Sequence, residues 1–174
     1  GYILKKGSPT CGMERVKVYA ENGIPLDKGT GLFAQKLMAH YPNLPIEEEG
    51  RLHDPHLLEN FIERVFLYYR WQQLISNGLT AHKLIQFHSQ YKYALMAHSV
   101  KAYRKIGQLL SDLKSPDLNV LAEQYISEMM FAFSKVTRKS GRVNSLLHIY
   151  GYLKKHLSKS ESAELRGAIE DYQN

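Results

Sequence analysis

The most reactive side chain in the sequence is a thiol, and the chain has one of them. Cys11 is the single cysteine among 174 residues, and it stands in a short run of small and turn-forming residues that includes Ser8, Pro9 and Gly12. A free cysteine is most often a small buried apolar group. The neighbouring residues instead favour a loop that displays the thiol, with backbone N–H groups able to approach an anion or a sulfide. Both interpretations of Cys11 stay open at this point.

One thiol is too few for a metal or cluster site. Iron–sulfur clusters are usually held by three or four thiolates, so further ligands would have to come from outside residues 1–174. The eight histidines suggest no metal site, because His88 and His98 lie about 80° apart around a helix. We expect surface or hydrogen-bonded histidines. A lone cysteine also excludes an internal disulfide and is typical of a reducing compartment, so we expect a cytoplasmic protein.

Three adjacent carboxylates, Glu47, Glu48 and Glu49, form a second group with chemical potential. One of them could act as an acid or a base, but adjacent carboxylates are usually solvated or paired, here with Arg51. The sequence contains no P-loop, GxGxxG or HExxH motif and no Ser/His/Asp order typical of hydrolases. Sequence motifs alone therefore do not assign an enzymatic reaction.

Positive charge is concentrated in the second half of the chain. Residues 80–174 carry 14 Lys or Arg and 8 Asp or Glu, whereas residues 1–79 carry 9 of each, so the second half supplies the net charge of +6. Cations alternate with tyrosines over residues 90–105, a mixture that can hold single-stranded RNA through phosphates and stacked bases. The same residues suit a helix–helix interface with tyrosine hydroxyls at its rim. The candidate RNA contacts are Lys92, Lys101, Arg104 and Lys105.

A second group of cations flanks Ser140 and Gly141, where we expect a break between helices. These cations could bind a phosphate at the N-terminus of the next helix. Stabilisation of the carbonyl groups that end the preceding helix is the favoured interpretation. The group consists of Lys135, Arg138, Lys139 and Arg142.

The first 53 residues read as a short mixed segment. Residues 15–19 alternate between polar and apolar and predict a strand, and the apolar run at residues 2–4 predicts another. Residues 24–27 read as a loop and residues 47–51 as a charged connector. Thr30 is expected to cap a short helix over about 31–40.

Beyond this segment, apolar residues recur at spacings of three and four, which predicts helices. Asp54 and Pro55 suit the start of the first helix, and breaks are expected at Ser115-Pro116 and Ser140-Gly141. The predicted helices span about 55–76, 80–98, 99–113, 117–137, 142–157 and 160 onward. The fold class is therefore mainly α, a bundle of about six helices with a small N-terminal α/β remnant. No apolar run approaches the ~20 residues that span a bilayer, so we expect no membrane contact.

Several ordered blocks of sequence resemble two known families. The back half of the thiouracil desulfurases, which have an iron–sulfur active site, is similar to residues 1–12, 15–19, 29–34 and 44–52. The YbgA-like helical domain that often follows it is similar to residues 87–88, 92–99, 103–104 and 147–155. The resemblance implies a desulfurase-like part at residues 1–53 and a YbgA-like domain at residues 54–174, both of them expected to be truncated at the outer ends of the chain.

The desulfurase resemblance implies a [4Fe–4S] cluster on three cysteines, with one iron open to the sulfur of a thiolated pyrimidine base or nucleoside. Cys11 matches the last of these cysteines. Ser8 matches a serine beside the substrate, where it would bind the substrate or assist proton transfer. The other two cysteines and a catalytic glutamate would precede Gly1, so this chain alone is expected to hold no intact cluster and to be inactive. For the helical part, substrate cover, a homodimer and RNA contact all remain open.

Overall fold

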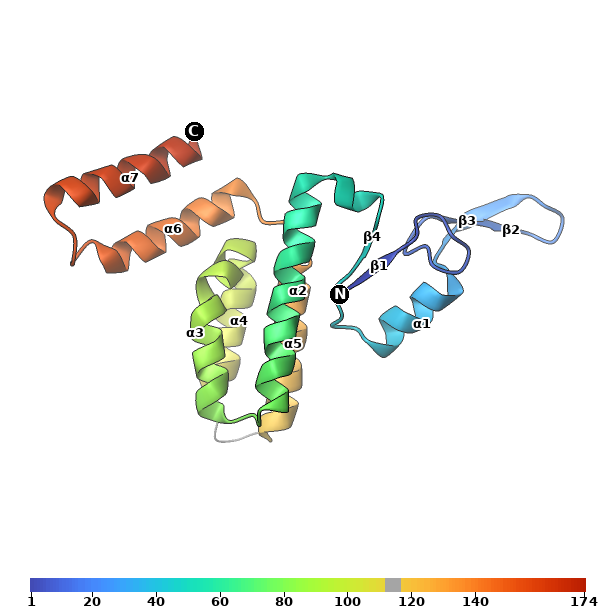
Figure 1. The fold of residues 1–174 in the computed structure, drawn as a ribbon, viewed down its shortest axis with the longest axis horizontal. Coiled ribbons are helices and arrows are strands. Elements are labelled where there is room, and N and C mark those ends of the chain that lie inside the picture. Colours follow the sequence, from blue (N-terminus) through green and yellow to red (C-terminus); the bar gives the residue numbers. More distant parts are fainter. Residues whose placement is uncertain (112–116) are drawn as a thin grey trace. The chain divides into compact units, whose positions relative to one another are not determined.

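The computed structural model describes residues 1–111 and 117–174, which form two compact units, Gly1–Gln73 and Leu74–Asn174. Helices dominate the described part of the chain (Figure 1), which confirms the mainly α prediction. The predicted break at Ser115-Pro116 lies outside the described residues. The division between residues 53 and 54 that the family resemblance implies stays a prediction. None of the helices in the described ranges is long and apolar enough to cross a membrane.

The first unit contains two small two-stranded sheets. Strand β1 pairs in parallel with β4, with Leu4 opposite Glu48, and β2 pairs with β3 in the antiparallel sense. Leu4, Ala34 and Ile46 form the buried apolar cluster beside the first sheet. The elements of this unit are β1 (Tyr2–Leu4), β2 (Val16–Tyr19), β3 (Pro25–Gly29), α1 (Leu32–His40), β4 (Ile46–Glu48), the 3₁₀ helix η1 (Arg51–His53) and most of α2 (Pro55–Ser76).

Three predictions for this unit were wrong. Residues 25–29 form β3 instead of a loop, because they pair with β2 across a short turn. Residues 46–48 form β4 instead of a connector, although glutamate is a poor strand former, because β1 supplies the backbone partners. Thr30 does not cap α1: the N-cap is Gly31, and it makes no side-chain capping bond.

Helices make up most of the described residues of the second unit, and none of these residues is in a strand. Its helices are α3 (Ala81–His98), α4 (Val100–Ser111), α5 (Leu118–Phe133), α6 (Lys139–Leu153) and α7 (Lys159–Gln173). Helix α3 contacts α4, α5 and α6, and α6 contacts α7. The residues Ser140 and Gly141 lie in the first turn of α6 instead of breaking a helix. Helix α7 is capped by Ser158 instead of Ser160, because Ser158 and Glu161 form a reciprocal capping box.

Aromatic side chains join α3 to α5 in the core of this unit. Tyr125 and Phe133 on α5 are fully buried. The ring of Phe87 meets Tyr125 edge-on with centroids 6.2 Å apart, and Tyr91 meets Phe133 at 6.5 Å. Tyr91, one of the tyrosines in the basic aromatic stretch, is therefore a core residue. For this residue the helix–helix interface is the correct interpretation.

We predict opposite effects for two glycines of α6. A Cβ atom at Gly141 would overlap the carbonyl oxygen of Ala97 on α3, whereas a Cβ atom at Gly151 meets nothing within 4 Å. Gly141→Ala should lower the free energy of unfolding by about 1–3 kcal/mol, as overpacking does. Gly151→Ala should raise it by up to about 1 kcal/mol through helix propensity. Urea unfolding measures both, and equal effects would contradict the close approach of α6 to α3.

Candidate functional site

Residues 5–14, here called the Cys11 loop, connect β1 to β2 and are closed by Ser8. The Ser8 hydroxyl oxygen accepts the backbone N–H of Thr10 at 3.3 Å and that of Cys11 at 3.1 Å. The Ser8 carbonyl accepts the N–H of Gly12 at 2.8 Å. Ser8 therefore holds the turn that carries the thiol.

The backbone N–H groups of residues 10–14 of the Cys11 loop are all hydrogen-bonded within the protein. The N–H groups of Thr10, Cys11 and Gly12 donate to Ser8. The next two N–H groups, those of residues 13 and 14, donate to the Glu48 carboxylate. The expectation that N–H groups of the loop approach an anion therefore fails for Thr10, Cys11 and Gly12, which donate to Ser8, whereas residues 13 and 14 donate to an anion of the protein itself, the Glu48 carboxylate.

The N-terminus of helix α1 is hydrogen-bonded to the Cys11 loop. The N–H groups of Phe33 and Ala34 donate to the carbonyl oxygen of Thr10 at 2.9 and 3.2 Å, so the loop backbone satisfies the helix N-terminus that lacks a side-chain cap. A Cβ atom at Gly31 would overlap the Thr10 carbonyl and lie 2.8 Å from the Cys11 nitrogen. Glycine at this position therefore lets the loop lie directly on the start of α1.

The thiol itself is half-buried. Cys11 packs partly against the apolar cluster of Leu4, Ala34 and Ile46, yet its side chain keeps access to solvent. A thiol on a free tail would have no fixed position. The structure gives Cys11 a hydrogen-bonded backbone and leaves the residue partly exposed, which suits a ligand.

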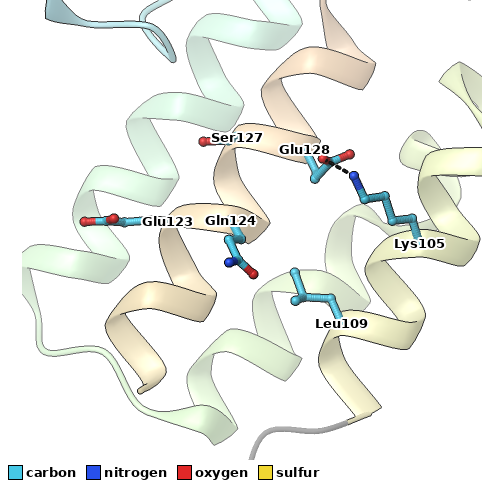
Figure 2. Close-up of a pocket in the computed structure, with 6 residues that line it drawn as sticks. All are labelled: Lys105, Leu109, Glu123, Gln124, Ser127 and Glu128. Atoms are coloured by element: carbon cyan, nitrogen blue, oxygen red, sulfur yellow. Dashed lines mark hydrogen bonds and ion pairs between the residues drawn. The ribbon is translucent and has the colours of Figure 1, made fainter. Parts of the chain in front are cut away.

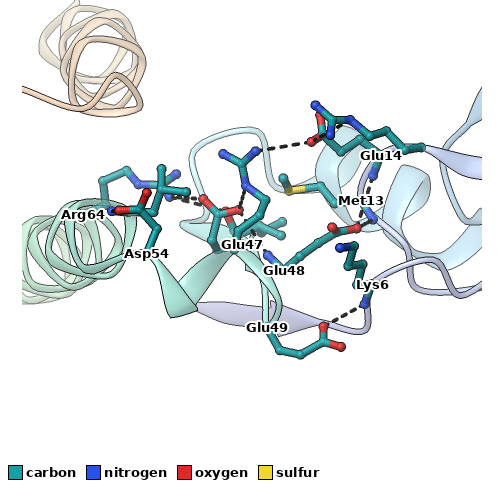
Figure 3. Close-up of polar contacts among 12 residues, drawn as sticks. Lys6, Met13, Glu14, Glu47, Glu48, Glu49, Asp54 and Arg64 are labelled. Carbon is teal, nitrogen blue, oxygen red and sulfur yellow. Dashed lines mark hydrogen bonds and ion pairs between the residues drawn. The ribbon is translucent and has the colours of Figure 1, made fainter.

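The carboxylates of β4 and the residue after it reach both ends of the Cys11 loop (Figure 3). Glu48 is 3% exposed, and its Oε1 accepts the N–H of Met13 at 2.8 Å and that of Glu14 at 3.4 Å. Glu49 Oε2 accepts the N–H of Lys6 at 2.7 Å, and this bond is the main reason why the pKa of Glu49 is lowered. The expectation of solvated carboxylates was wrong for Glu48.

Glu47 is paired, as predicted, with Arg51. Its Oε1 lies 2.6 Å from Arg51 Nε, and its Oε2 lies 3.5 Å from a terminal nitrogen of Arg64. Burial acts to lower the pKa of Arg51, but the hydrogen bond and charge of Glu47 outweigh it and raise that pKa. For Arg64 burial prevails and lowers the pKa, although Glu47 opposes it. Glu47 is therefore committed to ion pairs.

Cys11 has no set of fellow ligands in the part of the chain that the structure describes. Among residues 1–111 and 117–174, no group of three or more His, Cys, Asp or Glu side chains is placed to hold a metal ion. A soft thiolate is a suitable ligand for iron, so Cys11 could supply one protein ligand of a cluster. The remaining protein ligands of such a cluster would have to come from residues outside 1–174.

Three of the four candidate RNA contacts, Lys101, Arg104 and Lys105, lie within about one turn of α4, whereas Lys92 lies on α3. Lys101 and Lys105 line one groove of the second unit. Lys92 instead lies over the rings of Tyr93 and Tyr152, 5.0 and 5.9 Å from their centroids. Arg104 is exposed on α4.

This groove, here called the basic groove, has a volume of about 510 Å³. Its lining residues include His98, Lys101, Lys105, Phe131 and Lys135. The ring of Phe131 is 68% exposed, and Lys135 Nζ lies 5.6 Å from its centroid. The sequence interpretation missed Phe131 and assigned Lys135 to a helix end, because both residues lie outside the 90–105 stretch.

A second pocket, of about 500 Å³, lies between α4 and α5 (Figure 2). Lys105 lines it too, but its cation is paired there with Glu128, and Glu123 adds a second carboxylate. Two carboxylates against one lysine disfavour a phosphate. The Lys105–Glu128 pair also lines the basic groove, but there Lys101 and Lys135 add two further positive charges. The basic groove is therefore the better anion site.

We predict that Ser8 orders the thiol. Ser8→Ala removes the acceptor of two N–H groups and should speed hydrogen exchange of the Cys11 amide roughly tenfold, since a net hydrogen bond contributes about 1 kcal/mol. Ser8→Asn should restore slow exchange, because an Asn oxygen accepts the same N–H groups in an Asx turn. NMR-detected exchange measures this. An unchanged rate in Ser8→Ala would contradict the role.

Comparison with known proteins gives matches at both ends of the chain. The 2-thiouracil desulfurase family matches residues 1–49, and a family described as protein of unknown function (DUF1722) matches residues 92–174. The uncharacterized protein YbgA of Escherichia coli (strain K12) is 30% identical over 110 residues, which are 63% of this chain. The chain covers 65% of the length of YbgA. No solved structure matches the chain. The predicted resemblance is thereby confirmed: the chain is similar to 2-thiouracil desulfurases in its first 49 residues and to the DUF1722 family in residues 92–174.

Proposed function

We propose that this chain is part of a [4Fe–4S]-dependent desulfurase that acts on thiolated pyrimidine bases or nucleosides, and that Cys11 is an iron ligand. The observation that carries the proposal is the Cys11 loop, a hydrogen-bonded turn that carries a partly exposed cysteine. Within it the N–H groups of residues 10–14 are all bonded. The family match over residues 1–49 includes Cys11 and Ser8.

The residues present account for part of the site. The sequence has one cysteine, so a cluster bound to Cys11 needs its other protein ligands from outside residues 1–174. When bound, such a cluster would supply a Lewis-acidic iron toward the sulfur of the substrate. The contribution of this chain is to fix one thiolate in place.

Ser8 is suited to a second role. Its oxygen accepts two backbone N–H groups, and a hydroxyl that does so still has its own proton to donate. Ser8 and Cys11 are three residues apart in one turn. We propose that the Ser8 hydroxyl donates to the thiolated pyrimidine or passes a proton to it.

The ligand role of Cys11 is tested by cluster reconstitution. The full-length natural protein is treated with iron and sulfide, and Cys11→Ala is expected to lose most of the visible cluster absorption because one thiolate is missing. Thr10→Ala, one residue away and without a sulfur, is the matched control and should keep it. Unchanged absorption in Cys11→Ala would contradict the proposal.

We propose as a second candidate function that the helical unit binds single-stranded RNA through the basic groove. The specific observation is an exposed ring, that of Phe131, beside Lys101 and Lys135. Base stacking on an aromatic ring combined with phosphate contacts is the usual design of such sites. This function needs no cluster and would also suit a module without enzymatic activity.

Salt dependence separates the contributions to this binding. In the full chain, Lys101→Ala and Lys135→Ala should each reduce the slope of log K against log salt by about 0.7, the value for one lost phosphate contact on a single strand. Phe131→Ala should weaken binding with the slope unchanged. Lys159→Ala on α7 is the control for charge alone. Absence of binding at low salt would overturn this candidate.

A further inference from the structure

Two carboxylates hold the Cys11 loop from opposite ends, and neither belongs to the loop. We propose that Glu48 and Glu49 are positioning residues that fix the Cys11 thiol. This inference deepens the proposed function and rests on it for its chemical meaning. Its structural content concerns this chain alone.

Glu48 anchors the end of the loop that follows Cys11. Its Oε1 accepts the N–H of Met13 at 2.8 Å and that of Glu14 at 3.4 Å, and its side chain is buried. Hydrogen bonds to a carboxylate are about twice as strong as those between neutral groups. Loss of this acceptor would leave backbone donors in a partly buried place without a partner.

Glu49 anchors the end that precedes Cys11. Its Oε2 accepts the N–H of Lys6 at 2.7 Å, and its Oε1 lies 3.2 Å from Lys5 Nζ. The pKa of Glu49 is lowered mainly by the bond from Lys6, as expected when the N–H group favours the ionised carboxylate. Both anchors therefore act on the backbone.

The two anchors come from one place because β4 lies beside β1. Leu4 is opposite Glu48, and the N–H of Glu49 donates to the carbonyl of Leu4 at 3.1 Å. The Cys11 loop starts directly after Leu4. The same strand end thus reaches the first residues of the loop through Glu49 and its last residues through Glu48 (Figure 3).

A ligand held in this way is preorganised. Functional side chains must be held within about 0.5 Å of their working position by a supporting shell. Cys11 lies between the anchored amides of Lys6 and Met13, and Ser8 closes the turn between them. Movement of the Cys11 backbone away from its position, and of the thiol with it, requires that one of these contacts breaks.

Hydrogen exchange in the full chain tests the inference without any cluster. Glu48→Ala should speed exchange of the Cys11 amide roughly tenfold, through local opening of the loop. That amide donates to Ser8 and loses no partner directly, so it reports the position of the loop. Glu48→Gln should restore slow exchange, because its amide oxygen accepts the same N–H groups. Faster exchange at Met13 and Glu14 alone would overturn the proposal.

Further variants separate positioning from stability. Glu47→Gln weakens the ion pairs to Arg51 and Arg64, and it reaches the loop only indirectly, through the Arg51–Glu14 pair and the N–H of Glu48. Its effect on Cys11 exchange should therefore be smaller than that of Glu48→Ala. Glu21→Ala, in the exposed turn after β2, controls for loss of a carboxylate. If Glu48→Ala does not fold, Glu49→Ala provides the test, because Glu49 is 37% exposed. An unchanged Cys11 rate in that variant would equally overturn the inference.

Failure of this inference can be told apart from failure of the proposed function. If the reconstituted Cys11→Ala protein keeps its cluster, the ligand role fails, whereas the exchange results still decide whether Glu48 and Glu49 hold the loop. If Cys11 does bind iron, Glu48→Ala should lose iron to a chelator several-fold faster than Glu47→Gln. Equal loss from both variants would contradict the positioning role and leave the ligand role in place.

Discussion

Backbone pairing between β1 and β4 is the constraint on which the Cys11 site depends. Without it Leu4 would not lie opposite Glu48, and the carboxylates would not reach the loop. A shift of the pairing by one residue would turn each β4 side chain to the other face. Glu48 would then leave the N–H groups of Met13 and Glu14. The pairing of β1 with β4 therefore places Leu4 and Ile46 in the apolar cluster beside the loop. It also brings Glu48 and Glu49 within hydrogen-bond distance of the loop backbone.

The charged side chains buried next to β4 have partners for most, but not all, of their polar atoms. Buried carboxylates are costly unless they are paired or hydrogen-bonded. Arg51 and Arg64 neutralise Glu47, and backbone N–H groups satisfy Glu48. Arg64 Nε nevertheless has no hydrogen-bond partner among the described residues, although it is buried. An apolar β4 would avoid this cost and would not hold the loop, which is the pattern expected where placement matters more than stability.

The helices could be predicted from the sequence because their signals are local. Apolar spacing and caps such as Thr80 and Ser99 act within one or two turns, and both residues accept the expected N–H groups. Strand β4 could not be found in this way, because its partner lies more than forty residues away and its own residues favour other conformations. At the site, residue types identified Cys11 and Ser8. The role of Glu48 depends on strand register, which single residues do not encode.

The two units carry different chemistry, and each proposal depends on one of them. The first unit fixes a thiol and a hydroxyl in one turn, the two groups that the desulfurase proposal assigns to iron and to the substrate. A free base has no phosphate, so it would gain nothing from the lysines of the basic groove. The lysines of the basic groove, among them Lys101 and Lys135, instead suit the phosphates of a polynucleotide, which is what the second proposal requires. The two proposals therefore rest on separate observations in separate units, and each is decided by its own experiment.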